Sequence, residues 1–390
     1  MSKVKFGDVV TRANTKEDKD NTEKIYYVGG EHIDSNEVVI EKRGLIAGST
    51  IGPMFYFGFN SGQVLFVTRN PHLRKAGMVT FDGICSEKTF VLETKDENIL
   101  LQRYLPFIMQ SDHFWSYMEA HKSGSVNFFI NWSTLAKYEF ELPDIGKQES
   151  LSEMLWAINN TKLAYRNLIA KTDDLVKAQF IEMFGDTVSD NQKYDSVPLI
   201  DIFDKPQGGE WGADDPSGTG TPVLRTTNFT DDGYVDYTDV ATRIINPQKL
   251  QKKSLLKGDI LIEKSGGSND KPVGRVVFFE GEDGVYLNNN FTARLHLNSK
   301  YELINEYVFF FMFVNYWSDG TKVFEGKTTG IHNLHLTDYL QSTRIPIAPG
   351  PEQEKFVLLF RQSDKSKFEL QQAITNLEGL QKSLLSENFQ

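Results

Sequence analysis

One stretch of the sequence places acidic residues and a lysine close enough together to suggest nuclease chemistry. Asp259, Glu263 and Lys264 resemble the P-D…E-x-K arrangement that metal-dependent nucleases use. In that arrangement the lysine stands two positions after the glutamate, where this sequence has Ser265. We therefore interpret the stretch as the end of a strand followed by solvated charge, and not as a catalytic centre.

Other signatures of catalysis are incomplete. A methyltransferase needs a glycine-rich cofactor turn and an Asn/Asp-Pro-Pro-aromatic loop, and the nearest sequence, NPHL at 70–73, lacks the second proline. His332 and His335 form a lone i, i+3 pair without the spacing of a metal site. The stretch SGGSNDKPVG (265–274) could cradle a phosphate, but it lacks the Gly-Lys-Ser/Thr of a P-loop. We expect no catalytic residue, no metal and no cofactor.

Residue types that contact DNA are concentrated in a few loops. Polar and cationic side chains read base edges, Lys, Arg and backbone amides bind phosphates, and glycine lets the backbone approach closely. The candidates in the first half of the chain are Arg69, Asn70, His72, Lys75, Lys122 and Ser123. Those in the second half are Arg225, Thr227, Asn228, Lys264, Ser265, Gly266, Asn289, Lys327, Thr328 and Thr329. The alternative is that these loops are solvated turns.

Net charge gives a warning about this assignment. A value of −11 argues, taken alone, for a protein partner and against nucleic acid. Phosphate binding depends, however, on where the cations lie, and several are clustered in one short stretch. They are Lys249, Lys252, Lys253, Lys257, Lys264, Lys271 and Arg275.

Size and composition favour two domains in a reducing compartment. A chain of 390 residues with 39% hydrophobic residues and 28 Phe can bury two sizeable cores. The single cysteine, Cys85, excludes an internal disulfide. The N-terminus lacks the apolar run of a signal peptide, and the apolar stretch 307–317 is too short to span a bilayer, so it reads as a buried helix or strand. We expect a soluble, cytoplasmic protein.

The middle and the end of the chain repeat one another. Residues 172–184 and 376–389 contain four matched pairs at a constant separation of 205 positions, which is 389 minus 184. The matched pairs are Leu175 with Leu380, Lys177 with Lys382, Glu182 with Glu387 and Phe184 with Phe389. A repeat of this length indicates duplicated structural units.

The repeat continues upstream with one residue lost. Gly124 matches Gly330 and Asn127 matches Asn333, both at a separation of 206 (330 minus 124). Each half therefore contains G-x-x-N, a proline, a Gln-Glu pair and then a long run without proline. The two asparagines could contact bases, or they could cap or brace their loops.

The two long runs are predicted to be helices. Between 149 and 184 there is no proline, and apolar residues recur at spacings of three, four and seven, as in a coiled-coil seam. The positions assigned to the two seams include Leu151, Leu155, Ile158, Leu168, Leu175, Phe180, Phe356, Phe360, Ile374, Leu380 and Leu384. We expect the helices to pair with one another; the alternative is that each packs only on its own domain.

With these features together, the chain resembles the specificity (S) subunit of type I restriction-modification systems. The segment TTGIHNLHLTDYLQSTRIPIAPGPEQEKF (328–356) is most similar to the family signature, and LLKGDILIEKSGGSNDKPVGRVVFFEG (255–281) is a second match. The order of head, G-x-x-N, proline, Gln-Glu and long helix, written twice, carries the resemblance over the whole chain. It is strongest in the second half and in the helices, and looser in 1–120.

The resemblance implies an α+β fold in which two long antiparallel helices separate two globular target recognition domains, with a pseudo-twofold internal repeat. The implied boundaries are 1–145 for the first domain, 146–186 for the central helix, 187–349 for the second domain and 350–390 for the C-terminal helix. Each domain would read one half of a split site on double-stranded DNA. The helices would dock two modification (methyltransferase) subunits, which restriction (nuclease) subunits join, and the chain itself would be non-catalytic.

Elementary geometry agrees with this picture. Two readers on one face of B-DNA must lie about one helical turn, roughly 34 Å, apart, and a rigid helix pair would set the number of unread base pairs between them. A non-catalytic acidic scaffold, or a DNA mimic that binds another protein, would explain the net charge of −11 more directly. The lysine cluster within 249–275 counts against a DNA mimic.

Overall fold

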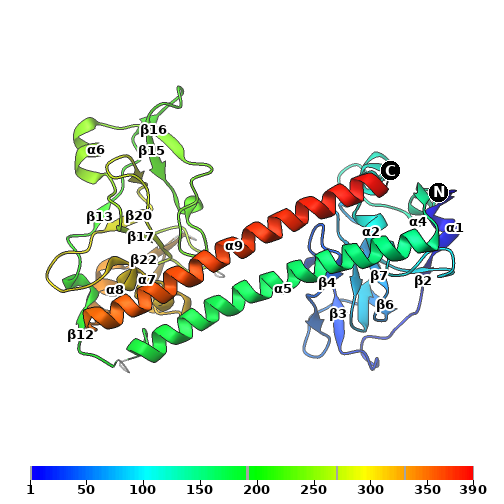
Figure 1. Ribbon diagram of the computed structural model, residues 1–390, viewed down its shortest axis with the longest axis horizontal. Helices are drawn as coiled ribbons and strands as arrows, with labels where there is room; N and C mark the ends of the chain where they lie inside the picture. Colours follow the sequence, from blue (N-terminus) through cyan, green and yellow to red (C-terminus); the bar gives the residue numbers. More distant parts are fainter. Residues whose placement is uncertain (1, 190–192, 269–270, 329–330, 390) are drawn as a thin grey trace. The chain divides into compact units, whose positions relative to one another are not determined.

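Two compact units make up the computed structural model, which describes residues 2–189, 193–268, 271–328 and 331–389. The first unit is Met1–Leu168 together with Glu369–Gln390, and the second is Ile169–Phe368. The boundary crosses two long, continuous helices, α5 (Ile145–Phe184) and α9 (Gly350–Asn388), as Figure 1 shows. We call the strands and short helices that precede α5 the first head, and those between α5 and α9 the second head.

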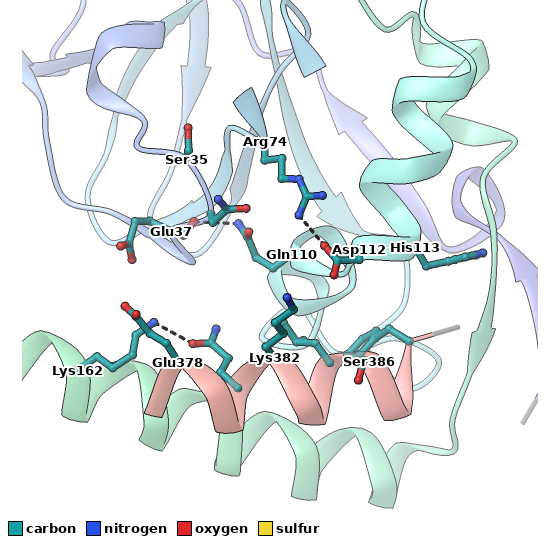
Figure 2. Close-up of a pocket in the computed structure, with 14 residues that line it drawn as sticks. Ser35, Glu37, Arg74, Gln110, Asp112, His113, Lys162, Glu378, Lys382 and Ser386 are labelled. Atoms are coloured by element: carbon teal, nitrogen blue, oxygen red, sulfur yellow. Dashed lines mark hydrogen bonds and ion pairs between the residues drawn. The ribbon is translucent and has the colours of Figure 1, made fainter. Parts of the chain in front are cut away.

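In the first unit the start of α5 packs against the end of α9. The Lys162 ammonium donates to the Gln381 amide oxygen at 2.9 Å, and the Arg166 guanidinium lies 3.1 Å from the Glu378 carboxylate. Because residue numbers rise along one helix as they fall along the other, the pairing is antiparallel. Figure 2 shows Lys162 and Glu378 beside a cavity of about 840 Å³ that Arg74 of the first head also lines.

In the second unit the end of α5 packs against the start of α9 in the same sense. Asp173 and Lys367 form an ion pair at 2.7 Å, and the rings of Phe180 and Phe356 lie 5.0 Å apart. The prediction of an α+β fold with two long antiparallel helices is therefore confirmed. The alternative, in which each helix packs only on its own head, is wrong.

The first head is built on two main sheets. The five-stranded sheet has the order β2 (Val10–Ala13), β10 (Thr89–Thr94), β7 (Val64–Val67), β8 (Ala76–Val79), β4 (Val39–Ile40). The four-stranded sheet has the order β5 (Gly44–Leu45), β3 (Tyr26–Val28), β9 (Gly83–Ser86), β6 (Phe55–Phe59). A separate pair joins β1 (Ser2–Lys5) to β11 (Glu139–Leu142). The helices are α1 (Phe6–Val9), α2 (Leu105–Gln110), α3 (Asp112–Ala120) and α4 (Trp132–Ala136).

The second head has two four-stranded sheets. Their orders are β13 (Gln207–Gly208), β20 (Thr292–Leu295), β17 (Ile260–Glu263), β18 (Val276–Phe278), and β14 (Ala213–Asp214), β16 (Ala241–Ile244), β15 (Thr221–Leu224), β19 (Leu287–Asn288). Two strand pairs are β12 (Ser196–Pro198) with β23 (Arg344–Pro346), and β21 (Glu325–Thr328) with β22 (Ile331–Leu334). The helices are α6 (Pro247–Lys253), α7 (Asn305–Trp317) and α8 (Leu336–Ser342).

The two heads share a central layer of three antiparallel strands. β10, β7 and β8 of the first head correspond to β20, β17 and β18 of the second, in the same order. Residues 62–70 and 258–266 align in sequence without a gap, and that alignment places β7 on β17 at both ends. The heads therefore kept one backbone plan while most of their side chains changed.

Each head is completed by the end of the other repeat's helix. Phe389, which directly follows α9, is buried in the first unit, and its ring stacks on Tyr104 at 5.1 Å. Phe184, at the end of α5, is buried in the second unit, and its ring packs on Tyr307 at 4.8 Å. The repeated phenylalanines thus hold each helix end in a hydrophobic core.

The assignment of every apolar helix position to the seam is partly wrong. Leu155 and Phe180 are fully buried, but Leu168, Leu175 and Leu380 are 49%, 64% and 49% exposed. The reason is geometric, since a helix in contact with one partner buries only one stripe and other apolar positions face outward. The apolar stretch 307–317 lies in the buried helix α7. Within the described ranges, no helix is long and apolar enough to cross a membrane.

Candidate nucleic-acid interface

Three segments of the second head meet where β17 ends. The backbone amide of Lys264 donates to the carbonyl of Phe291 at 2.7 Å, and the amide of Leu334 donates to the carbonyl of Lys264 at 2.8 Å. Gly266 then donates to His332 at 3.1 Å. The end of β17, the turn before β20 and the strand β22 therefore form one surface, which we call the second strand-end surface.

The first head repeats this pattern where β7 ends. Thr68 donates through its amide to Lys88 at 2.8 Å, and Ile130 donates to Thr68 at 2.9 Å. Asn70 then donates to Phe128 at 3.0 Å. The structure thus brings 68–70 together with 122–130, two segments that are 52 positions apart in sequence (122 minus 70). We call this region the first strand-end surface.

The shared G-x-x-N has a different register in the two heads. Ser265 forms a β-bridge with Asn333, whereas the corresponding bridge of the first head joins Arg69 to Phe129 and not to Asn127. Asn333 accepts a hydrogen bond from the Ser265 hydroxyl, and the Asn127 carbonyl accepts one from Arg69 at 3.4 Å. The Asn333 contact is made by its side chain and holds its loop, whereas the Asn127 contact is made by the backbone, so the choice between bracing a loop and contacting a base stays open for Asn127.

Most candidates in the first head lie on or beside its strand-end surface. The Arg69 guanidinium lies over the Phe129 ring at 5.1 Å. Lys122 pairs with Glu119 at 2.7 Å and lies over Phe128, and Ser123 bridges to Phe129. Asn70 and His72 are exposed, and Asn70 has a left-handed backbone (φ 52°). Lys75 instead donates to the carbonyl of Gly30 at 2.6 Å, so its ammonium is engaged inside the head.

In the second head, Arg225 and Asn228 hold a neighbouring loop together. Arg225 donates to the Asp239 carboxylate at 2.9 Å. Asn228 is buried, accepts from the Arg225 amide at 2.9 Å and donates to the carbonyls of Asp236 and Asp239. Thr227, between them, is exposed.

Of the remaining candidates in the second head, some lie on the second strand-end surface and others shape the turns beside it. Asn289 is buried and accepts from the Phe291 amide at 3.2 Å, so it shapes the turn before β20. Gly266 is exposed with φ 122°, a conformation that favours glycine. Lys327 and Thr328 belong to β21. Thr329, with the neighbouring Gly330, lies outside the described residues.

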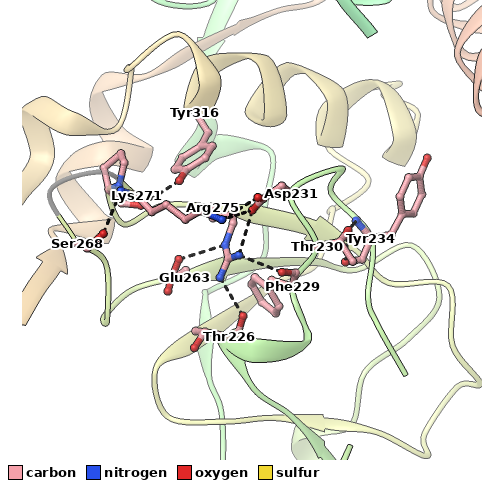
Figure 3. Close-up of polar contacts among 11 residues, drawn as sticks. Thr226, Phe229, Thr230, Asp231, Tyr234, Glu263, Ser268, Lys271, Arg275 and Tyr316 are labelled. Atoms are coloured by element: carbon pink, nitrogen blue, oxygen red, sulfur yellow. Dashed lines mark hydrogen bonds and ion pairs between the residues drawn. The ribbon is translucent and has the colours of Figure 1, made fainter. Parts of the chain in front are cut away.

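Arg275 links the end of β17 to the loop that contains Thr226 and Phe229, as Figure 3 shows. Its guanidinium donates to the carbonyls of Thr226 at 2.9 Å and Phe229 at 3.0 Å, and lies 3.5 Å from the Glu263 carboxylate. Lys271 and Arg275 both pair with Asp231. Burial raises the pKa of Glu263, and Arg275 opposes that rise.

The cation cluster and the incomplete nuclease pattern both have structural roles. Lys249 and Lys253 pair with Glu210 at 2.9 and 3.1 Å, so much of the cluster is neutralised within the head. Asp259 is fully buried and contacts His296 at 2.6 Å. Because Asp259 and Glu263 are buried, the expectation that their charge is solvated was wrong. No group of three or more potential metal ligands occurs in the described part of the chain.

Phe291 is a surface residue that the sequence did not single out. It is 53% exposed and lies opposite Lys264 on the second strand-end surface. Successive strand residues face opposite sides of a sheet. Because Thr292 at the start of β20 is buried, its neighbour Phe291 is expected to face outward, and this alternation could have identified it.

Comparisons with known proteins point in one direction. Residues 191–378 match the family model of the type I restriction modification DNA specificity domain. A search of curated proteins found no match.

Two solved structures have a similar fold over the whole chain. One belongs to a study of complex assembly and conformational transition of the type I R-M system; it is 18% identical, has a TM-score of 0.54, and the match covers 99% of this chain and 97% of that one. The other is the S subunit of a type I restriction-modification system from M. genitalium, with 12% identity, a TM-score of 0.54, and coverage of 100% and 96%.

Proposed function

We infer that this chain is a DNA specificity subunit of a type I restriction-modification system, because residues 191–378 belong to the type I restriction modification DNA specificity domain family. The fold of such subunits extends over the whole chain. The chain selects the DNA sequence, and methylation and cleavage belong to other subunits of the complex. The comparisons offer no support for an acidic scaffold or a DNA mimic.

The observation that carries this function is the repeated strand-end surface. Both heads bring the end of the central strand, the turn of its neighbour and a third segment together through the same backbone hydrogen bonds. The side chains on that common frame differ: Thr68 and Arg69 in the first head correspond to Lys264 and Ser265 in the second. A duplicated frame with different side chains suits a bipartite site in which each head reads one half.

The candidates other than Lys75, Asn228 and Asn289 are proposed to contact DNA, and these three to shape the loops. In the first head the contacts are assigned to Arg69, Asn70, His72, Lys122 and Ser123. In the second head they are assigned to Arg225, Thr227, Lys264, Ser265, Gly266, Lys327, Thr328 and Thr329. Lys75, Asn228 and Asn289 support these residues through their internal hydrogen bonds.

The paired helices are proposed to set the spacer and to dock two modification subunits, which restriction subunits then join. Leu175 in the second unit and Leu380 in the first are equivalent in the repeat and are 64% and 49% exposed. Exposed leucines on a long helix suit a protein partner, and two equivalent positions suit two copies of the same partner.

Titration of duplex DNA tests the function directly. The chain is purified with its methyltransferase partner and titrated with duplexes at two salt concentrations. Because phosphate contacts release counterions, we expect affinity for the cognate duplex to fall steeply as salt rises. Failure to bind any duplex, including genomic fragments of the source organism, would overturn the assignment.

A further inference from the structure

Phe291 is an exposed aromatic ring on a fixed turn. Phe291 is 53% exposed, at the point where β19 turns into β20. Exposed aromatic surface is unfavourable in water, so a well-braced turn that presents a ring outward is suited to contact with another molecule.

The turn that carries Phe291 is held from several sides. The buried Asn288 amide donates to the Thr292 hydroxyl at 3.0 Å, and Asn289 accepts from the Phe291 amide at 3.2 Å. The amide of Glu210 donates to the Asn288 carbonyl at 2.8 Å. A side chain at Gly209 would collide with the carbonyl oxygens of Asn288 and Asn289, so the two segments lie in close contact. The position of Phe291 is therefore fixed by its surroundings.

Lys264 lies directly across the sheet from Phe291. Glu263 pairs with Thr292 in the antiparallel ladder, and the next pair along, Lys264 and Phe291, is joined by a backbone hydrogen bond of 2.7 Å. Directly opposed residues of antiparallel strands project from the same face, with Cβ atoms about 5 Å apart. The lysine and the ring therefore share one face.

The Lys264 ammonium lacks an internal acceptor among the residues that the structure describes. It is half-buried, and it lies 3.8 Å from the point that a Cβ at Gly208 would occupy, so the glycine leaves room for it. Burial first, and then the charge of Lys253, lower the pKa of Lys264. Other lysines of the head, such as Lys249 and Lys271, have carboxylate partners. An anion from outside would complete the surroundings of Lys264.

A half-buried ammonium beside an exposed aromatic ring matches the chemistry of a nucleotide. The phosphate supplies the missing anion, and the neighbouring base supplies an apolar surface for the ring. An acidic peptide with a neighbouring apolar side chain would meet the same two needs, and the proposed function decides for the nucleotide.

We propose that Lys264 and Phe291 form a single nucleotide-recognition site in the second head, in which the ammonium binds a backbone phosphate and the ring contacts the adjacent base. This rests on the proposed function and assigns separate roles, anchoring and sequence reading, to two residues. The equivalent positions of the first head are Thr68 and Lys88, where the backbone amide of Thr68 donates to the carbonyl of Lys88 at 2.8 Å. Neither has an aromatic ring, so Phe291 helps to determine the second half-site only.

The experiment uses the full chain with its methyltransferase partner and compares Phe291→Ala with Lys264→Gln. Affinities are measured for the cognate duplex and for a panel with single base changes in each half-site, at several salt concentrations. We expect F291A to weaken cognate binding roughly 10-fold, with an unchanged salt slope and with discrimination lost at adjacent base pairs of the second half-site. K264Q should weaken binding about equally across the panel and reduce the salt slope by about 1.

Two controls separate this role from a general effect on the head. Phe291→Trp keeps an aromatic ring and should retain most of the affinity. Ile244→Ala removes another apolar side chain of the second head, one that is 56% exposed on β16, and should leave binding unchanged.

The results distinguish this inference from the assignment of function. If the wild-type complex binds a bipartite duplex and F291A binds it with the same affinity and discrimination, the role of Phe291 is refuted and the function stands. Loss of discrimination at the first half-site, or equally at both, would also refute it. If the wild-type complex binds no duplex, the function itself is refuted.

Discussion

At the scale of single residues, the charges of the second head show why net charge is a poor guide to DNA binding. Glu210 forms ion pairs with Lys249 and Lys253, and Asp231 forms ion pairs with Lys271 and Arg275. Such pairs contribute little to a long-range field, because each cation is compensated within a few ångströms. Net charge therefore says less about DNA binding than the few cations that have no internal partner.

Among these four cations, we expect replacement of Arg275 to lower the free energy of unfolding most. It is 16% exposed as a side chain and is the cation beside the buried Glu263. Replacement by methionine leaves that carboxylate without compensation, so we expect Arg275→Met to lower the free energy of unfolding by about 3 kcal/mol. Urea unfolding of the full chain measures this. Lys271→Met is the control, since Lys271 is 60% exposed and should change stability by less than about 0.5 kcal/mol.

The difference in the free energy of unfolding between Arg275→Met and the wild type should also depend on pH. Burial raises the pKa of Glu263 above its ordinary value of 4.5, and in the variant Arg275 no longer opposes that rise. At pH values between 4.5 and the raised pKa of Glu263, the folded state binds a proton that the unfolded state does not. The free energy of unfolding therefore increases as pH falls through this range. Unfolding measured from about pH 8 to about pH 5 should show the gap to wild type narrowing. A constant gap would mean that Glu263 is not the cause.

At the scale of elements, the sequence predicted what depends on local pattern. The proline-free runs gave both long helices, and the ungapped match of 62–70 with 258–266 gave the equivalence of β7 and β17. The meeting of 68–70 with 128–130 could not be foreseen, because strand pairing between distant segments depends on the whole fold. Nor could residue type separate Asn228, which braces a loop, from exposed Asn70, since an amide suits both roles.

The helix ends offer a matched test of how the elements depend on one another. Phe389 is 5% exposed on Tyr104, and its repeat equivalent, Phe184, is fully buried on Tyr307. Replacement of either phenylalanine by alanine leaves a cavity and should lower the free energy of unfolding by about 3 kcal/mol. We expect Phe389→Ala to reduce hydrogen-exchange protection in α2, and Phe184→Ala to reduce it in α7. Equal loss of protection in α2 and α7 for both variants would contradict separate cores.

At the scale of the whole molecule, duplication explains why the two units are built from equivalent parts. Each unit consists of a head, the start of that head's own helix and the end of the other repeat's helix. Neither half of the sequence can therefore complete a unit by itself. Under the proposed function this arrangement suits a single chain with two different reading heads, because each head contacts the end of the other repeat's helix.

The spacer prediction tests the proposed role of the helices. One heptad is inserted into α5 after Leu168 and one into α9 after Phe368, where the boundary between the units crosses both helices. Seven residues add about 10 Å at 1.5 Å per residue, and a heptad preserves the side of the helix that faces its partner. We expect both half-sites to stay the same and the spacer to lengthen by up to about three base pairs, at about 3.4 Å each.

Sequencing of methylated sites, in a host that expresses the variant with its partner subunits, reads the spacer directly. A heptad inserted into α5 alone is the control: it shifts Lys162 away from Gln381 or Asp173 away from Lys367, leaving a buried ammonium without its partner. That variant should lose methylation instead of gaining a new spacer. If the double insertion methylates sites with the original spacer, helix length does not set the distance between the half-sites, and the heads must be positioned on DNA by the partner subunits.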